Sequence, residues 1–285
     1  MPDRLVLGAV AYDPKVVTIW AGFRDWFRDR GLTLDFVLYA HYEHQVAALL
    51  DGDVDLAWNS PLAWVRARRL ARHRGLALRP VAMRDTDRDL TSVIVVPTGS
   101  DLRTLTDLRG RRLATAAVDS PQARLLPLAL LRAAGVDPAT ELTVRRFDVG
   151  VGLHGDHVGG ERDAARALRD GEVDAACLVD ANLLLFAREG VLPAGSVRVL
   201  AQTEPYDHCL LTAGPEADPA LVDRFRDLLL SMSYADPRAR PLLDLEGLKE
   251  WLPARTDRYE ALERAVTESG LYDERGAVCD PEYRP

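Results

Sequence analysis

Short runs of aliphatic and β-branched residues alternate with longer segments in which apolar residues recur every three or four positions. The short runs predict strands, and the longer segments, most of them closed by glycine, predict amphipathic helices. The predicted strands cover 5–10, 34–39, 54–58, 91–96, 111–117, 143–149, 173–179, 197–202 and 209–213. The predicted helices cover 16–30, 43–50, 61–74, 120–134, 161–169, 221–234, 242–251 and 258–269. This alternation predicts an α/β protein with mainly parallel sheets flanked by helices.

An internal repeat predicts two similarly built lobes. Residues 46–57 and 164–176 each read as the end of a helix, a glycine stop, an acid-Val-Asp turn and the start of a strand. Glycine supplies the left-handed cap that lets the chain fold back onto a sheet. We expect lobe 1 to contain 1–95 plus 207–285, and lobe 2 to be the inserted segment 96–206. Two crossovers, near 95–97 and 200–203, then act as hinges.

Composition narrows the classes of partner. The 285 residues are 47% hydrophobic and carry a net charge of −8, so a real core is available and the basic face expected of a nucleic-acid-binding protein is missing. No run of eighteen apolar residues occurs, which predicts no membrane insertion. Residues 1–10 lack the pattern of a signal peptide, so a chain that naturally begins here is expected to be cytoplasmic. The three cysteines do not form a disulfide framework pattern.

Two helix starts are candidate anion sites. Ser60-Pro61 follows one predicted strand and Ser120-Pro121 follows another, and each pair places serine at the N-cap and proline in the first turn. A helix N-terminus offers backbone N–H groups and the positive end of the helix dipole to an anion. The alternative is that Ser-Pro only starts these helices, as it does in many proteins.

Further polar side chains follow the predicted strands. In open α/β sheets, ligands bind beyond the carboxyl ends of the strands. The candidate ligand contacts of this kind are Tyr12, His41, Asn59, Gln122, His154, His157, Asp180, Asn182 and His208. Five of the six histidines fall at strand ends, which predicts a polar pocket for a small polar or anionic molecule.

Two other kinds of site are alternatives to that pocket. His41-x-x-His44 and His154-x-x-His157 have spacings that zinc would accept, but two histidines in a loop are a weak motif. The glycine-rich segment 150–160 contains the letters of a dinucleotide motif without a helix opening directly after it. We therefore expect no metal site and no cofactor.

Several segments together resemble the phosphonate- and phosphite-binding proteins of ABC importers. Gly-Asp-Val-Asp-Leu-Ala with the following Asn-Ser-Pro (52–61) is similar to the first lobe of that family. Residues 105–114 are similar to its lead-in to the second lobe, and 119–127 stand where it carries an anion loop. His154 and the segment 164–176 stand where the family has a cleft histidine and the strand after it.

The resemblance implies a type II periplasmic-binding-protein fold that grips its ligand in a cleft between the lobes. The contacts it carries over by position are Tyr12, Ser60, Ser120, Gln122, His154 and Asp180. The anion loop departs from the family pattern, because Ser120 is its only hydroxyl residue. The expected ligand is therefore a phosphonate, phosphate, sulfonate or carboxylate.

Two alternative functions stay open from the sequence. Cytosolic enzymes such as the menaquinone-pathway lyases and the thiamine-pyrimidine synthases resemble this fold, and a cleft with His, Asp and Tyr is suited to acid–base chemistry. A ligand-sensing domain that acts on a protein partner is the other alternative. The sequence identifies neither such a partner nor the ligand itself.

Overall fold

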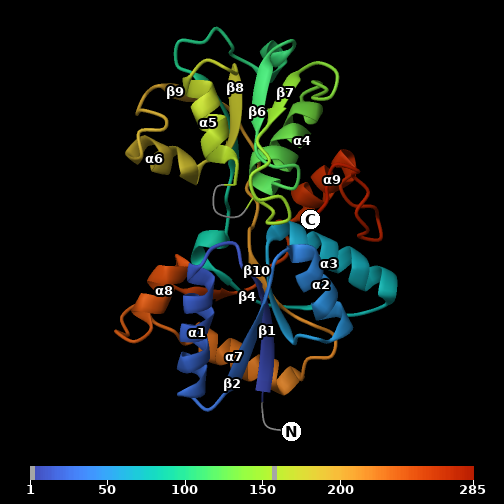
Figure 1. Ribbon diagram of the computed structural model, residues 1–285, viewed down its shortest axis with the longest axis vertical. Coiled ribbons are helices and arrows are strands. Elements are labelled where there is room, and N and C mark those ends of the chain that lie inside the picture. Colours follow the sequence, from blue (N-terminus) through green and yellow to red (C-terminus); the bar gives the residue numbers. More distant parts are fainter. Residues whose placement is uncertain (1–3, 156–158) are drawn as a thin grey trace. The chain divides into compact units, whose positions relative to one another are not determined.

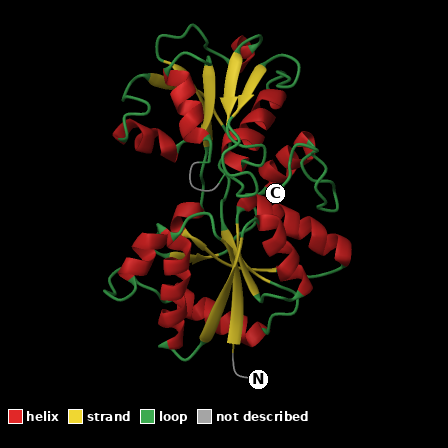
Figure 2. Ribbon diagram, in the orientation of Figure 1, coloured by secondary structure: helices red, strands yellow, loops and turns green. Residues whose placement is uncertain are grey.

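The computed structural model describes residues 4–155 and 159–285 and divides them into two compact units. Unit 1 contains the chain up to Arg88, then Asp207–Arg258 and Glu274–Ala277. Unit 2 contains Asp89–Tyr206, Tyr259–Asp273 and Val278–Pro285. Each unit is a β-sheet with helices against it (Figures 1 and 2). No helix among the described residues is long and apolar enough to span a membrane.

The sheet of unit 1 has six strands in the order β11-β4-β10-β3-β1-β2. Their bounds are β1 (Arg4–Val10), β2 (Thr33–Tyr39), β3 (Leu56–Asn59), β4 (Arg79–Arg84), β10 (Leu210–Ala213) and β11 (Trp251–Pro253). β1 is parallel to β2 and β3, whereas β10 is antiparallel to both β3 and β4, and β11 is antiparallel to β4. The strands β1 to β4 therefore share one direction, and their carboxyl ends meet at one edge.

Helices pack on both faces of this sheet. They are α1 (Lys15–Arg28), α2 (Tyr42–Asp51), α3 (Pro61–Arg74), α7 (Pro219–Leu230) and α8 (Arg240–Glu246). The main core lies under α1, α7 and α8 and is rich in aromatic rings; Phe27 stacks on Phe225 with ring centroids 4.7 Å apart. A smaller core under α2 contains Leu49 and Val54. The pattern of apolar residues every three or four positions in α1 explains which side it buries.

The sheet of unit 2 has five strands in the order β7-β6-β8-β5-β9. Their bounds are β5 (Ser92–Pro97), β6 (Arg112–Thr115), β7 (Thr143–Arg146), β8 (Ala175–Val179) and β9 (Val197–Gln202). β6 is parallel to β7 and β8, and β5 is antiparallel to β8 and β9. The carboxyl ends of β6, β7 and β8 thus lie at one edge, as the predicted mainly parallel arrangement requires.

The helices of unit 2 are α4 (Leu126–Ala133), α5 (Glu161–Arg169), α6 (Ala181–Arg188) and α9 (Glu260–Ser269). Small side chains such as Ala164 and Ala165 let α5 lie close to β8. A π-helical turn (Pro121–Leu125) precedes α4, and two 3₁₀ turns cover Asp85–Asp87 (η1) and Leu105–Leu108 (η2). The helix expected over 120–134 therefore begins as a π-helical turn after Ser120.

Several elements differ from the sequence prediction. The helix expected over 242–251 ends at Glu246, because Gly247 adopts a left-handed conformation with φ of 80°, and Trp251 instead begins β11. β4 and α6 were not predicted. Two assignments to units also differ from the expected lobes: α9 packs on α4 in unit 2, and the first crossing lies at Arg88/Asp89.

Candidate functional site

The carboxyl edge of the unit 1 sheet gathers several of the predicted contacts. Leu210, the first residue of β10, pairs with Asn59, the last residue of β3. Because these strands are antiparallel, the residues before β10 lie at the same edge as the residues after β3. His208 and Ser60 are therefore brought to one edge from segments far apart in the sequence.

Asn59 is fully buried and its amide is used within the protein. Its Nδ2 donates to Thr212 Oγ1 at 3.1 Å, and its Oδ1 accepts from Gln45 Nε2 at 3.0 Å. Gln45 Nε2 also donates to the carbonyl oxygen of Trp58 at 2.9 Å. This chain of buried amides joins α2, β3 and β10. Asn59 therefore stabilises this edge of the sheet through hydrogen bonds within the protein. The sequence alone could not distinguish this structural role from contact with a ligand.

Ser60 is the N-cap of α3, as the sequence predicted. Its Oγ accepts from the backbone N–H of Ala63 at 3.0 Å, and Pro61 occupies the first turn. Ser60 is fully buried. The N-terminal end of a 14-residue helix is thus fixed directly after β3, with the partial positive charge that such an end carries.

Tyr12 and His41 lie nearer the surface of unit 1. Tyr12 is partly buried against the main core, and His41 precedes α2 as its N-cap residue. The rings of His41 and His44 are 6.0 Å apart, and His44 is exposed. Of the residues described, the one group of three or more His, Cys, Asp or Glu side chains close enough to share an ion is elsewhere, at Asp87, His208 and Cys209.

The second helix start is covered by the glycine-rich loop of unit 2. Ser120 Oγ accepts from the backbone N–H of Ala123 at 3.2 Å, and Gln122 Nε2 donates to the carbonyl oxygen of Gly155 at 2.7 Å. A Cβ atom on Gly155 would lie 2.6 Å from Ser120 Oγ, and Gly155 has a φ of +72°. Only glycine lets the loop approach the serine turn this closely.

Asp119 fastens that loop to the turn. Its Oδ2 accepts from the backbone N–H groups of Gly152, at 2.7 Å, and His154, at 3.0 Å. Asp119 is fully buried, and its Oδ1 has no hydrogen-bond partner among the described residues. Burial raises the pKa of Asp119, although the nearby His154 and the backbone hydrogen bonds act in the opposite direction.

His154 is fully buried within unit 2. Its Nε2 lies 3.2 Å from Tyr283 Oη and 3.4 Å from Tyr272 Oη, and both tyrosines are buried. Its backbone has a φ of 54°, a left-handed conformation that histidine adopts more readily than most residues. Nε2 of His154, a predicted ligand contact, therefore lies beside two buried tyrosine hydroxyl groups. His157 lies outside the described residues.

Asp180 and Asn182 belong to a separate polar group at the end of β8. Asp180 Oδ2 accepts from Thr91 Oγ1 at 2.6 Å. Asn182 Nδ2 donates to Glu161 Oε2 at 2.8 Å, and the same oxygen accepts from the backbone N–H of Val179 at 2.9 Å. Glu161, which the sequence placed near the His154-x-x-His157 pair as a possible metal ligand, is fully buried and instead accepts these two hydrogen bonds.

Comparison with known families decides what kind of protein carries these features. The sequence model of one family, described as "ABC transporter, phosphonate, periplasmic substrate-binding protein", matches residues 9–259. The chain belongs to this family. Its predicted resemblance is thereby confirmed. The family's description is that of a periplasmic protein, so it gives no support to the expectation of a cytoplasmic one.

Solved structures similar to this phosphonate-binding family member confirm the fold class. PhnD1 from Prochlorococcus marinus (MIT 9301), in complex with methylphosphonate, is 18% identical with a TM-score of 0.68, covering 94% of this chain and 98% of that one. XAC2383 from Xanthomonas citri, bound to ATP, is 21% identical with a TM-score of 0.69 and the same coverage. The periplasmic aliphatic sulphonate binding protein SsuA from Escherichia coli is 20% identical with a TM-score of 0.60, covering 99% and 95%. The fold is that of a type II periplasmic binding protein.

The predicted contacts of this family member fall into separate groups. Ser120, Gln122 and His154 share the loop-covered turn of unit 2, whereas Asp180 contacts Thr91 and Asn182 contacts Glu161 at the end of β8. Asn59, Ser60 and His208 share the edge of unit 1. Sequence reasoning missed Asp119 although it directly precedes the serine turn. Tyr272 and Tyr283 carried no sequence signal, because their contact with His154 spans more than a hundred residues.

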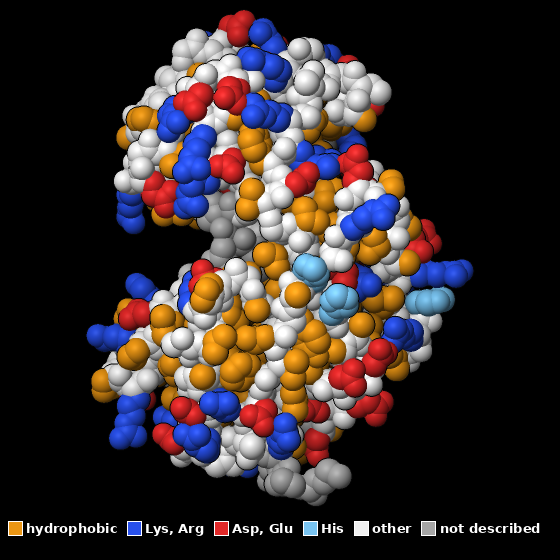
Figure 3. Space-filling view, viewed as in Figure 1, with side chains coloured by type: hydrophobic (Ala, Val, Ile, Leu, Met, Phe, Trp, Pro, Cys, Tyr) orange, Lys and Arg blue, Asp and Glu red, His pale blue; other side chains and the backbone are white. Residues whose placement is uncertain are grey.

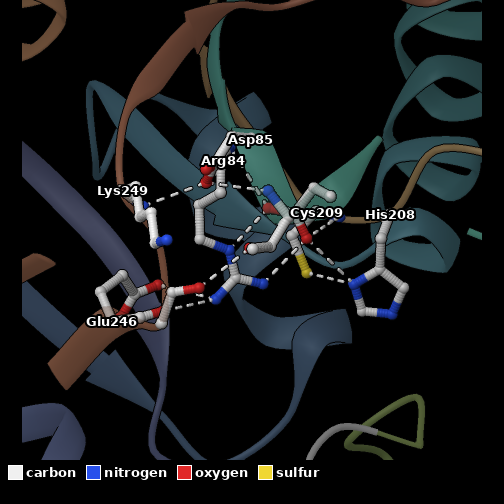
Figure 4. A network of polar contacts seen from close by, with 9 residues as sticks. Arg84, Asp85, His208, Cys209, Glu246 and Lys249 are labelled. Atoms are coloured by element: carbon white, nitrogen blue, oxygen red, sulfur yellow. Dashed lines mark hydrogen bonds and ion pairs between the residues drawn. The ribbon is translucent and has the colours of Figure 1, made fainter. Parts of the chain in front are cut away.

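His208 is part of a buried charged network that the sequence did not indicate (Figure 4). Its Nδ1 lies 3.0 Å from Cys209 Sγ and 3.4 Å from Asp87 Oδ1. Arg84 binds Asp87 through Nε, at 2.6 Å, and Nη2, at 2.8 Å, and its Nη1 donates to Glu246 Oε1 at 3.3 Å. Burial would raise the pKa of Asp87, but Arg84 outweighs it with help from His208 and lowers the pKa to about 2.

The face drawn in Figure 3 shows basic and acidic side chains interspersed over both units, without a continuous field of one sign. That distribution fits the net charge of −8. Steering of a ligand by a large surface field is not indicated on this face.

Proposed function

We propose that this protein binds a small anionic or polar molecule of the phosphonate, phosphate, sulfonate or carboxylate class and delivers it to the membrane subunits of an ABC importer. The observation that carries the proposal is the family match over residues 9–259. Proteins of similar fold are bound to methylphosphonate or ATP or are named as aliphatic sulphonate binders, so the ligand class is drawn from anions of this kind.

The two capped helix starts support an anionic ligand. Ser60 and Ser120 each follow a strand whose carboxyl end opens at the ligand-binding edge of its sheet. Both serines use their Oγ to cap the helix, so the groups left to meet an anion are mainly backbone N–H groups and the helix dipole. A site of this kind accepts a tetrahedral anion or a planar carboxylate.

The small number of side-chain donors in the Ser120 turn narrows the charge expected of the ligand. Gln122 is engaged by Gly155, and no further hydroxyl side chain follows Ser120 in the turn. A phosphonate dianion is held best by many donors, whereas sulfonates and carboxylates carry one charge and need fewer. We therefore place a monoanion first among the ligand classes.

Calorimetric titration tests this function directly. The protein is unfolded and refolded to remove any retained molecule, and then titrated with methylphosphonate, methanesulfonate, acetate and ATP. Saturable binding of at least one of them supports the proposal, and tighter binding of methanesulfonate than of methylphosphonate supports the monoanion. No binding by any of the four, in protein with native circular dichroism, contradicts it.

Two serine variants test which helix starts are used. Ser60→Ala and Ser120→Ala are each expected to weaken binding, because loss of an N-cap costs about 0.5–2 kcal/mol and loosens the first turn. Ser231→Ala is the matched control, since Ser231 Oγ donates to the Leu228 carbonyl at the exposed end of α7. Equal affinity in all three variants would show that neither helix start contacts the ligand.

The location of the mature protein follows from the same proposal. A protein that delivers ligand to an importer has to meet it outside the cytoplasm, which agrees with the periplasmic description of the family. Fractionation of cells that produce the complete gene product is expected to recover it outside the cytoplasm. Recovery from the cytoplasm alone would favour the sensing or enzymatic alternatives.

A further inference from the structure

The network around His208 lies beside two points where the chain passes between the units. Asp87 ends the 3₁₀ turn η1, two residues before Asp89 begins unit 2, and His208 follows the return of the chain at Asp207. The backbone N–H of His208 donates to the Asp87 carbonyl at 2.8 Å, and that of Cys209 donates to Asp87 Oδ1 at 3.2 Å. The outgoing and returning segments are thus joined inside unit 1.

We propose that Asp87 Oδ1, His208 Nδ1 and Cys209 Sγ form a binding site for a divalent metal ion of the Zn²⁺ type. These three atoms all lie within 4.8 Å of one another. Zinc bonds of about 2.3 Å to sulfur and 2.0–2.2 Å to nitrogen or oxygen bring tetrahedral ligand atoms to similar separations. Thiolate, imidazole and carboxylate together are the donor set that zinc accepts. The proposal does not depend on which anion the protein carries.

The surrounding charges favour a cation despite the presence of Arg84. Arg84 contributes one positive charge, and Asp87 and Glu246 contribute two negative charges, all of them largely buried. Ionised Cys209 adds another negative charge. A divalent ion therefore neutralises the cluster. Arg84 fixes the Asp87 carboxylate by donating to Oδ2 through Nε and to Oδ1 through Nη2, and the same Oδ1 lies 3.4 Å from His208 Nδ1.

Metal binding displaces the thiol proton of Cys209 and does not require a new cavity. In the structure the three ligand atoms are close enough to share hydrogen bonds, so an ion takes the place of the thiol proton, which is released to solvent. The side chain of His208 is 17% exposed, which gives the ion a route in and leaves a fourth position for water.

A catalytic relay is a poorer interpretation of the same residues. In a nucleophile–His–Asp relay, the nucleophile and the carboxylate contact opposite ring nitrogens. Here Cys209 Sγ and Asp87 Oδ1 both lie next to Nδ1 of His208. One nitrogen cannot accept the thiol proton while donating its own proton to the carboxylate.

Cobalt substitution provides the test. Chelator-treated, reduced protein is titrated with Co²⁺ in the absence of any anion ligand, and the expected result is a thiolate-to-cobalt charge-transfer band that saturates at one ion per chain. Cys209→Ser is expected to abolish the band. Cys279→Ser is the matched control and is expected to keep it, because Cys279 is the exposed cysteine. Burial raises the pKa of the Cys177 thiol, so Cys177 does not compete.

Two results would overturn the proposal: no charge-transfer band in the unmodified protein, or a band that persists in Cys209→Ser. His208→Gln provides a second measurement if the serine variant folds poorly. It keeps the thiolate and is expected to weaken Co²⁺ binding about tenfold or more. Unchanged affinity in a folded His208→Gln variant also contradicts the site.

Hydrogen exchange tests what the ion does to the fold. Bound Zn²⁺ is expected to slow amide exchange at residues 85–90 and 204–210, because it ties together the segments beside both chain crossings. The same protection should be absent from Cys209→Ser. Protection spread evenly over the chain, or none at these segments, would contradict a site at this position.

Discussion

At the scale of single residues, the loop over Ser120 is held by groups with little freedom to change. Asp119 accepts two backbone hydrogen bonds from the loop while burial opposes its charge. Gly155 combines a left-handed backbone with a contact too close for any side chain. Burying the Asp119 carboxylate costs free energy of desolvation. The two hydrogen bonds that it accepts offset part of this cost and order the segment that carries His154.

Gly155→Ala tests how tightly this loop is placed. The added Cβ would lie 2.6 Å from Ser120 Oγ and 2.8 Å from Gln122 Nε2. Gly110→Ala is the matched control, because Gly110 has a φ of +73° but nothing within 4 Å of the added Cβ. Both variants pay about 1–2 kcal/mol for a left-handed alanine, and Gly155→Ala is expected to lose at least about 1 kcal/mol more.

Urea unfolding of the two glycine variants measures that difference. A larger loss of unfolding free energy in Gly155→Ala supports the close approach of loop and turn. Equal losses would mean that the loop moves away at little cost, and Gly155 would then matter only for its backbone conformation.

At the scale of elements, the periodic pattern predicted most strands and helices, and it failed where tertiary contacts decide. β1, α5 and β9 match their predicted positions closely because each has a clear apolar face. β4 contains Pro80 and two arginines, so its pattern is obscured, yet pairing with β10 and β11 makes it a strand. The sequence could not assign α9 to a unit, because an amphipathic helix does not identify its partner.

The candidate site shows the same limit. Ser60 and Ser120 were predicted correctly as N-caps, because capping is a local interaction that the sequence records. The contacts of Asn59 with Thr212, and of His154 with Tyr283, join residues more than a hundred positions apart. No local pattern reveals such pairs, so a polar residue at a strand end could not be assigned to ligand contact or to structural support.

The C-terminal segment 278–285 is the element whose role is easiest to test. Tyr283→Phe removes the hydroxyl beside His154 Nε2 and keeps the buried ring. Loss of this buried hydrogen bond is expected to cost about 1 kcal/mol of unfolding free energy. Tyr234→Phe is the control, since Tyr234 Oη donates to Asp244 Oδ1 at 2.6 Å in an exposed position.

Chemical denaturation separates the two tyrosine variants. We expect a clear loss for Tyr283→Phe and almost none for Tyr234→Phe, because exposed groups regain their hydrogen bonds from water. The same loss in both, or none in Tyr283→Phe, would show that the C-terminal segment contributes little through this hydroxyl. The His154 ring could then bind another polar group without loss of a stabilising contact to Tyr283.

At the scale of the whole molecule, each unit has its own core, and the segments that join the units are fixed by polar contacts. Asp207, at the return of the chain to unit 1, is fully buried. It accepts two hydrogen bonds from Arg255, from Nε and from Nη2, both at 2.7 Å. Together with the Arg84–Asp87 pair, this arrangement places two charge pairs of unit 1 beside the points where the chain passes between the units.

Arg255→Ala tests whether such a pair stabilises one unit more than the other. Removing Arg255 takes away the paired hydrogen bonds of a buried carboxylate, a change that costs about 3–5 kcal/mol when a buried pair is broken. Arg226→Ala is the control, because Arg226 is half-buried, its partner Asp227 is exposed, and surface ion pairs of this kind contribute little to stability. Calorimetry is expected to show that Arg255→Ala moves the unfolding of unit 1 to lower temperature and leaves a separate transition for unit 2.

A single transition that shifts as a whole would instead mean that the two units unfold together. The loss of unfolding free energy would then be shared by the entire chain.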